Sequence, residues 1–181
     1  MKILDTRFKD CFLIKPDVHR DSRGFFLESF QLKRYQTFLG LKDPLVQDNF
    51  SRSSFGTLRG LHFQNKNPQG KLVMVSVGSV LDVVVDLRKD SETFSQWESF
   101  ELSDQNLHQL WVPPGFAHGF LVTSNYANFH YKCTEYYNSE DEGSIKWNDP
   151  TLNITWPDGI KFIISEKDNN APSFKKFLSL K

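Results

Sequence analysis

The chain of 181 residues carries 22 Lys and Arg against 22 Asp and Glu, so its formal net charge is zero near neutral pH. This length suffices for one domain with a substantial hydrophobic core, and we expect a single domain over residues 1–181. The balanced charge argues against nucleic acid or an anionic membrane surface as a partner, because both are attracted by excess positive charge. A local basic pocket for one small anion is compatible with this balance.

The chain shows the features of a cytoplasmic protein. Four charged side chains within residues 5–10 interrupt the N-terminal apolar residues, so the apolar core of a signal peptide is missing. The longest apolar run, residues 80–87, contains Asp82 and is far too short to span a bilayer. Cys11 and Cys133 lie far apart without metal-binding spacing, which is typical of free thiols in a reducing compartment.

In chain order, the first predicted element is an amphipathic helix. The segment ESFQLKRYQTFLG, residues 28–40, has helical periodicity, a polar surface and a terminal Gly40. The other apolar runs are short, rich in β-branched or aromatic residues, and separated by turn residues. One short helix among many short strands predicts an all-β protein.

Three later segments are predicted as strands. KLVMVSVGSVLDVVVDLR, residues 71–88, reads as two strands bent about Gly78 and Ser79. WVPPGFAHGFLVTS, residues 111–124, reads as a Pro-Gly corner entering a strand, and ANFHYKCTEYYN, residues 127–138, as a strand with alternating faces. The predicted fold is a double-sheet antiparallel jelly roll, cupin-like, with short peripheral helices.

Side chains in a strand alternate between two faces, which sorts the residues of the 127–138 segment. The presumed inner face carries Phe129, Tyr131, Cys133 and Tyr137, and the other face carries His130, Lys132, Thr134 and Tyr136. Tyr131 is by this pattern alone a core residue. His118 shares its parity with Phe120 and Val122, which is the pattern of a hydrogen-bonded core histidine.

Histidines on a jelly roll raise the question of a metal site. The segment PPGFAH matches the second cupin motif and would present His118, but GLHFQNKN offers His62 and then Gln64 where a His-x-His pair is needed. A first-row metal normally takes three or more imidazole, carboxylate or thiolate ligands. Lys71 and Arg59 would also repel a divalent ion, so we expect no metal.

The same residues suit proton transfer. His62 has the ordinary imidazole pKa of about 6.5, near that of a general base at neutral pH. Lys71 and Arg59 could clamp a phosphate or stabilise an oxyanion. Asp168, in the segment ISEKDNN, could orient the imidazole of His62. The composition of this segment alone favours a solvated turn. A base, a cation at a carbonyl oxygen and a phenol on the opposite wall would together invert a carbon next to a ketone.

Arg59 and His62 are three residues apart, so a regular strand would send them to opposite faces. Either a bulge at Gly60 turns both inward, or Arg59 serves elsewhere.

Six segments in order resemble the dTDP-4-dehydrorhamnose 3,5-epimerase family: QDNFSRSSFGTLRGLHFQ, QGKLVMVSVGSVLDVVVDLR, SETFSQW, LWVPPGFAHGF, YKCTEYY and IKWNDPTLNITWP. The resemblance extends from RGFFLESF, at residue 23, to SEKD, at residue 165. It implies a cofactor-free homodimer with a cupin-type jelly roll, acting in dTDP-L-rhamnose synthesis for cell-surface polysaccharide. The implied substrate is dTDP-4-dehydro-6-deoxy-D-glucose, whose C4 ketone acidifies the hydrogens at C3 and C5.

The resemblance also implies residue roles. His62 corresponds to the base, Asp168 to its partner, Tyr131 to the acid on the opposite face, and Lys71 to the cation near the C4 oxygen. The segment containing Arg23 resembles one that crosses to the partner subunit. The residues that match nucleotide-sugar contacts are Arg23, Glu28, Gln47, Asn49, Arg59, His118, Glu142 and Lys167, with Tyr137 as a thymine-stacking ring.

One position departs from the family pattern. Phe50 stands where the family commonly has histidine, which could alter the sugar or nucleotide that is accepted. Two alternatives stay open: an epimerase that inverts only C3 or only C5, and a non-catalytic cupin module that binds a sugar or a metal.

Overall fold

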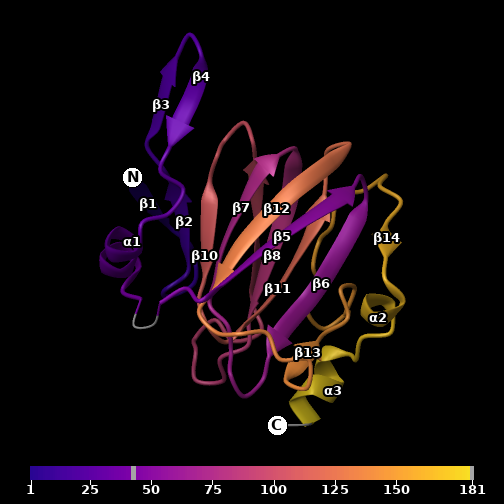
Figure 1. Ribbon diagram of the computed structural model, residues 1–181. Coiled ribbons are helices and arrows are strands. Elements are labelled where there is room, and N and C mark those ends of the chain that lie inside the picture. The colour runs from indigo at the N-terminus through magenta and orange to yellow at the C-terminus, as the bar shows by residue number, and fades with distance from the viewer. Residues whose placement is uncertain (42–43, 180–181) are drawn as a thin grey trace.

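Two antiparallel β-sheets face each other in the computed structural model, which describes residues 1–41 and 44–179 (Figure 1). The first sheet has the order β1 (Lys2–Asp5), β2 (Phe12–Lys15), β10 (Gln109–Val112), β7 (Lys71–Val77), β12 (Tyr126–Cys133) and β5 (Gln47–Ser54). The second has the order β13 (Glu142–Ser144), β6 (Thr57–Gln64), β11 (Phe116–Val122), β8 (Ser79–Asp86) and β9 (Trp97–Ser103). A short strand, β14 (Ile163–Ile164), runs parallel to β6.

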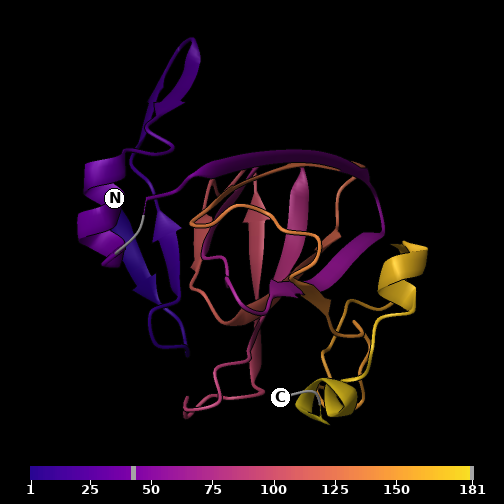
Figure 2. The same ribbon diagram turned by 60° about the horizontal axis from the view of Figure 1, so that its bottom comes forward.

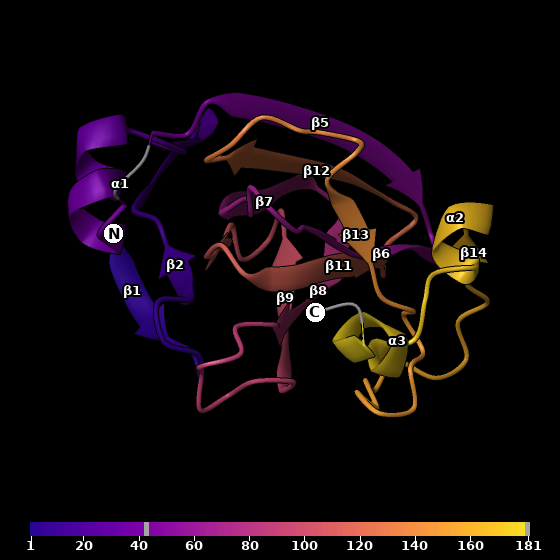
Figure 3. The ribbon, with the colours of Figure 1, turned by 90° about the horizontal axis from the view of Figure 1, so that it is seen from below.

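Seen from below, the sheets form a barrel with β5 and β12 on one side and β6, β11 and β8 on the other (Figure 3). The predicted double-sheet jelly roll is confirmed. That the chain is one domain stays a prediction, and its predicted span includes residues 42–43 and 180–181, which lie outside the described residues. No helix in the described ranges combines the length and apolar character needed to cross a bilayer.

The predicted pair of strands at residues 71–88 forms β7 and β8, joined at Gly78. Each strand belongs to a different sheet, so this junction carries the chain across the barrel. Gly78 has a φ of 79°, and a Cβ there would lie 2.0 Å from the carbonyl oxygen of Tyr126. A larger residue would collide with this backbone, so glycine is required at the crossing.

The core between the sheets is rich in aromatic rings, consistent with the 17 phenylalanines of the chain. Phe129 stacks on Phe120 with ring centroids 4.2 Å apart. The predicted inner face of β12 is confirmed for Phe129, which belongs to this core, for Tyr131, which packs against it, and for Cys133, which is fully buried. Placing Tyr137 on the same strand face was wrong, because β12 ends at Cys133 and Tyr137 lies in the following loop.

Helix α1 (Leu32–Leu39) packs outside the barrel beside β1 and β2 (Figure 1). It begins later than the predicted residue 28, because the side chain of Gln31 accepts the N–H of Arg34 and caps the helix there. It ends as predicted at Gly40, whose φ of 61° is left-handed.

The C-terminal region contains two short helices whose positions were not predicted from the sequence. Helix α2 (Glu166–Asn169) forms where composition favoured a solvated turn, because Ser165 accepts the N–H of Asp168 and caps it. Helix α3 (Phe174–Ser179) inserts two phenylalanines into the second core cluster, behind β6. These packed segments hold the end of the described chain against the second sheet.

Strands β3 (Val18–Asp21) and β4 (Gly24–Leu27) form a separate two-stranded hairpin. It projects away from the barrel (Figures 1 and 2). Phe25 and Phe26 are 51% and 69% exposed on it. The two residues follow each other along β4, so their rings lie on opposite faces of the hairpin. Large apolar rings exposed on both faces are typical of a segment that another molecule covers.

Candidate active site

A bulge on β6 turns two predicted site residues to the same face. Arg59 is paired with Phe120 of β11, and His62 is paired with His118. Three steps along β6 therefore match two steps along β11, which is the geometry of a β-bulge. Gly60 has a φ of 130°, and a Cβ there would lie 2.6 Å from the facing backbone of β11. The predicted bulge at Gly60 is confirmed.

Two adjoining cavities, of about 260 and 240 Å³, open inside the barrel. His62, Lys71 and Tyr131 line both of them and come from three strands, β6, β7 and β12. The first cavity is also lined by Gln47, Asn49, Tyr137 and Glu142, and the second by Arg59, His118, Phe120 and Phe129. The barrel thus gathers most of the predicted site residues around one imidazole, one amine and one phenol.

The structure brings His62 and Asp168 together. Nε2 of His62 lies 2.6 Å from Oδ1 of Asp168, which is 3% exposed. The backbone N–H of Gly60 donates to the other carboxylate oxygen at 3.3 Å. Burial alone would raise the pKa of Asp168, but the hydrogen bond and charge of His62 outweigh burial and lower it. A carboxylate in this position fixes the ring orientation and stabilises the imidazolium that forms when the ring accepts a proton.

Lys71 reaches the cavity from the first residue of β7. Burial lowers the pKa of its amine, while Cys133, Asp82 and Glu142 act in the opposite direction. An ammonium group in a partly desolvated cavity interacts strongly with negative charge that develops on a substrate.

Tyr131 faces the same space from β12. Burial, helped by the nearby Cys133, raises the pKa of its phenol. The phenol therefore keeps its proton at neutral pH and can donate it to a reacting carbon or oxygen.

A polar network borders the first cavity. The hydroxyl of Tyr137 donates to Oε2 of Glu142 at 2.9 Å, and Nζ of Lys167 is ion-paired with the same oxygen. The backbone N–H of Tyr137 donates to Gln47 at 2.8 Å, and Gln47 donates to Asn49 at 3.0 Å. Burial would raise the pKa of Glu142, but Lys167 and Tyr137 lower it through their hydrogen bonds. The edge of the cavity therefore carries donors, acceptors and an exposed ring.

Sequence reasoning missed Asp82, which lies 2.9 Å from Nε2 of His118 through both of its carboxylate oxygens. The signal was present in the chain, because Asp82 shares its strand parity with Val80 and Val84 of the core. His118 is 7% exposed and hydrogen-bonded, so its predicted place as a core histidine is confirmed. It also lines the second cavity.

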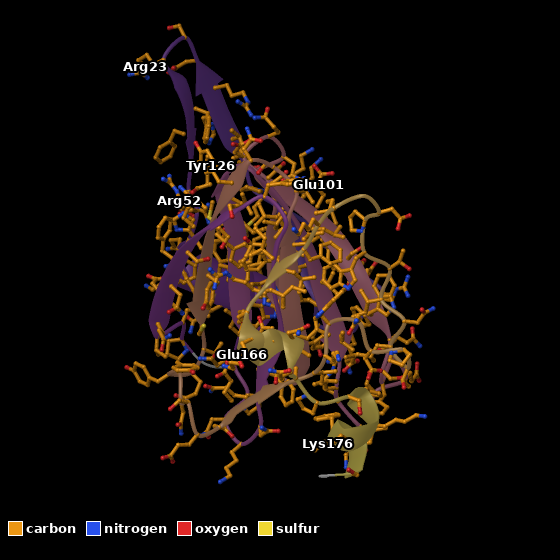
Figure 4. The ribbon with its side chains drawn as sticks, turned by 90° about the vertical axis from the view of Figure 1, so that its right-hand side faces the viewer. Arg23, Arg52, Glu101, Tyr126, Glu166 and Lys176 are labelled. Atoms are coloured by element: carbon orange, nitrogen blue, oxygen red, sulfur yellow. The ribbon has the colours of Figure 1, made fainter. Side chains whose placement is uncertain are left out.

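Arg23 and Glu28 are not brought to the cavity within one chain. Arg23 lies at the tip of the β3–β4 hairpin, far from helix α2, where Glu166 is labelled (Figure 4). Its side chain is 88% exposed and bonds to Asp21. Glu28 instead approaches Arg34 of α1 at 2.9 Å.

Phe50 lies on the outer face of β5, 60% exposed, with its ring 4.7 Å from that of His130. It lines a groove of about 450 Å³ on this outer face and neither of the two cavities around His62. The departure from the family histidine therefore lies on the outer surface of the sheet. Its effect on the sugar or nucleotide that is accepted stays a prediction. Within residues 1–41 and 44–179, no three His, Cys, Asp or Glu side chains converge as a metal site.

The barrel and its cavities define a class: a jelly-roll protein in which an imidazole, an amine and a phenol from three separate strands line the same interior space. The sequence profile of the family described as dTDP-4-dehydrorhamnose 3,5-epimerase matches residues 5–176. The chain belongs to the dTDP-4-dehydrorhamnose 3,5-epimerase family.

Individual relatives agree with this assignment. The dTDP-4-dehydrorhamnose 3,5-epimerase of Salmonella typhimurium is 49% identical, covering 95% of this chain and 94% of the relative. The structure of the 3,5-epimerase RmlC from Legionella pneumophila, in complex with dTDP-4-keto-L-rhamnose, is 51% identical with a TM-score of 0.94, covering 96% and 93%. The 3'-monoepimerase ChmJ from Streptomyces bikiniensis, with dTDP-quinovose, is 32% identical with a TM-score of 0.91, covering 97% and 89%.

Proposed function

We propose that this enzyme inverts C3 and C5 of dTDP-4-dehydro-6-deoxy-D-glucose and so produces dTDP-4-dehydro-L-rhamnose for dTDP-rhamnose synthesis. The observation that carries the proposal is the pair of adjoining cavities that His62, Lys71 and Tyr131 all line, with Asp168 bonded to His62. Family membership supplies the substrate, and the cavity supplies the groups that the reaction needs. The buried free thiols of Cys11 and Cys133 favour the cytoplasm as its compartment.

The first step is removal of a proton next to the ketone. His62 takes the proton from C3 or C5, and the bonding electrons move to the C4 oxygen to form an enolate. Asp168 stabilises the imidazolium that results. Lys71 stabilises the negative oxygen, and its partly buried position strengthens that interaction.

The second step returns a proton to the other face of the same carbon. Tyr131 projects from β12, in the sheet opposite the one that holds His62. Its phenol keeps its proton, because burial raises its pKa. Protonation from Tyr131 on one face, after removal by His62 on the other, inverts the centre. The first inversion leaves His62 protonated and Tyr131 as a phenolate, so His62 must release its proton to solvent and Tyr131 must take one up. The same two steps at the second carbon then complete the double epimerisation.

The nucleotide occupies the polar edge of the cavity in this proposal. Arg59 and Lys167 offer positive charge for a diphosphate, and the exposed ring of Tyr137 offers a stacking surface for thymine. Gln47 and Asn49 supply neutral hydrogen-bonding groups. Binding would have to loosen the Glu142 ion pair before Lys167 could turn to the phosphates.

The experiment that tests this function is incubation with the 4-keto substrate in deuterium oxide, followed by NMR of the product. Deuterium at both C3 and C5, with both centres inverted, is the expected result. Label and inversion at one centre only would identify a monoepimerase, the activity named for the neighbour ChmJ. No label at either carbon would leave a sugar-binding module and overturn the proposal.

The same proposal includes a homodimer in which the β3–β4 hairpin serves the partner's cavity. Arg23 cannot act in its own barrel as placed, and the exposed Phe25 and Phe26 accompany it. Co-expression of His62→Ala with Arg23→Ala chains should then restore one competent site per heterodimer. Heterodimers that form without recovering activity would show that Arg23 does not act across subunits.

A further inference from the structure

Gln64 is the last residue of β6 and lies two positions after His62 in a regular part of the strand. Side chains two positions apart share a face, and both residues line the 260 Å³ cavity. A metal-binding jelly roll would carry the second histidine of its His-x-His pair at this position. Gln64 is only 6% exposed, so its amide needs hydrogen-bond partners within the protein.

The amide of Gln64 bonds to the chain on both sides of Tyr137. Its Oε1 accepts the backbone N–H of Asn138 at 2.7 Å, and its Nε2 donates to the backbone carbonyl of Tyr136 at 3.3 Å. The same nitrogen donates to the carbonyl of Asn67 at 2.9 Å. The oxygen and the nitrogen are thus both engaged, which a carboxylate could not achieve because it has no donor.

The segment that carries Tyr137, residues 134–141, forms neither helix nor strand between β12 and β13. The backbone N–H of Tyr137 itself donates to Oε1 of Gln47, the first residue of β5, at 2.8 Å. In the described part of the chain, the hydrogen bonds that tie the backbone of residues 136–138 to the two sheets end on the side chains of Gln47 and Gln64. The placement of the Tyr137 ring therefore depends on one glutamine from each sheet.

The ring of Tyr137 is held at its far end as well. Its hydroxyl donates to Oε2 of Glu142, and Glu142 is the cross-strand partner of Gln64. Tyr137 is 54% exposed and lines the cavity, so the ring is fixed at both ends while its surface stays accessible. A fixed aromatic ring with an accessible face is a suitable stacking surface for a nucleobase.

We propose that Gln64 is a positioning residue of this epimerase: it holds the ring of Tyr137 as a wall for thymine and so determines how tightly the nucleotide half of the substrate is bound. The inference rests on the proposed function, which places thymine on this ring. Because Gln64 acts through Tyr137, it should affect binding of the base and leave proton transfer unchanged. A wall that binds substrate and transition state equally changes KM without changing kcat.

A purely structural role for Gln64 predicts something different. A side chain that only secures a loop would affect the stability of the fold and leave the ligand affinity of folded molecules unchanged. Asp149 provides the matched control, because it is 2% exposed and also bonds to loop backbone outside the two cavities. Its carboxylate accepts the N–H groups of Thr151, Leu152 and Phe174.

The test compares Gln64→Met, Tyr137→Ala, their double variant and Asp149→Asn. Methionine is about as long as glutamine and lacks the amide. We expect Gln64→Met to weaken binding of dTDP about tenfold, the size of a lost base–aromatic stack, and to raise KM with kcat little changed. The double variant should lose little beyond Tyr137→Ala, because both changes remove one contact. Asp149→Asn should lower stability while folded molecules keep their affinity for dTDP.

Calorimetric titration with pyrophosphate provides a readout that separates the base from the phosphates. Pyrophosphate has no base, so Gln64→Met should bind it as the wild type does. Equal weakening of dTDP and pyrophosphate binding overturns the proposal, and so does an unchanged affinity for dTDP in the folded variant. Tyr137→Ala with the wild-type affinity for dTDP overturns it as well.

Gln64→Asn carries the same comparison if Gln64→Met fails to fold. Its amide is one carbon shorter and cannot reach both Tyr136 and Asn138, so dTDP binding should again weaken and pyrophosphate binding should not. Wild-type affinity for dTDP in this variant overturns the proposal. Deuterium exchange by the wild type is measured separately, so its absence would overturn the proposed function, whereas the binding outcomes concern the role of Gln64.

Discussion

The two His–Asp pairs use the same residue types on neighbouring positions but differ in access to solvent. His62 and His118 are direct cross-strand partners, yet their side chains are 30% and 8% exposed. Asp168 comes from a helical turn outside the barrel and divides its oxygens between His62 and a backbone N–H. Asp82 comes from a core strand and directs both oxygens to His118.

This difference shows how burial separates two functions of one chemical pair. A general base must gain and release a proton in each turnover, so it needs an open face and a partner that orients it and stabilises its charged form. Both oxygens of Asp82 face one nitrogen of a buried ring, which fixes the orientation of that ring. The open pair suits proton transfer, and the closed pair suits a ring that keeps one orientation.

The largest expected effect comes from removing His62, the histidine of the more exposed pair. His62→Ala should abolish deuterium incorporation at both C3 and C5, because His62 is the cavity imidazole that Asp168 orients for proton removal. Loss of such a group typically costs roughly 10²–10⁴-fold in rate. The measurement is NMR of substrate incubated in deuterium oxide.

His118→Gln serves as the paired control for that experiment. It should slow exchange at both carbons while leaving exchange detectable, since His62 remains in place. If His118→Gln abolished exchange and His62→Ala did not, the two pairs would have exchanged roles.

The next effect concerns the acid that opposes the open pair. Tyr131→Phe should reduce inversion strongly, while some exchange with retention persists as His62 returns the proton to the face from which it came. A lost catalytic acid costs more than the roughly 0.5–1.5 kcal/mol of one hydrogen bond to a ground-state sugar. A several-fold rise in KM at constant kcat would show that Tyr131 only binds substrate.

A smaller effect, on stability, tests the bulge that turns Arg59 and His62 to the same face of β6. Gly60→Ala should lower the free energy of unfolding by about 1–3 kcal/mol, because its Cβ would meet the backbone of β11 at 2.6 Å. Gly24→Ala is a matched control, since Gly24 has the same φ of 130° with no atom within 4 Å. Urea unfolding of both variants separates the effect of the collision from that of backbone strain. An equal loss of unfolding free energy in the two variants would show that the collision contributes nothing.

The smallest effect is the acid dependence of stability. The pKa of Asp168 is lowered on folding, so its contribution is present above the unfolded value of about 3.9 and is lost as pH falls through the native value. Asp168→Asn should therefore flatten the decline of stability in this acidic window. Thermal unfolding measured across that window tests it, and an unchanged slope would contradict the assignment.

Much of the fold could be predicted from local pattern. Turn residues and strand alternation indicated β7, β8, β11 and β12, and Gly60 indicated the bulge. The partnership of His62 with Asp168 had no local signal, because the residues are 106 positions apart and the cap at Ser165 turned a polar segment into a helix. Residue chemistry offered Asp168 only as an alternative to a solvated turn, and the resemblance to a family implied its partnership with His62.

Two other features lay beyond single-sequence reasoning for different reasons. Asp82 was visible as a charge among valines, but its partner on another strand depended on the order of strands in the sheet. Arg23 lies outside its own barrel because the β3–β4 hairpin projects away from the two sheets. The strand pattern of these residues does not show the direction in which the hairpin points.

The distance in sequence between His62 and Asp168 has a consequence for synthesis of the protein. A nascent chain can complete strands β5 to β12 and close most of the barrel while residue 168 has yet to emerge from the ribosome. During that interval the imidazole lacks its carboxylate, and the bulge at Gly60 lacks one of its hydrogen bonds. Competence for catalysis is therefore acquired late in translation, when the segment from β13 to α2 docks along β6.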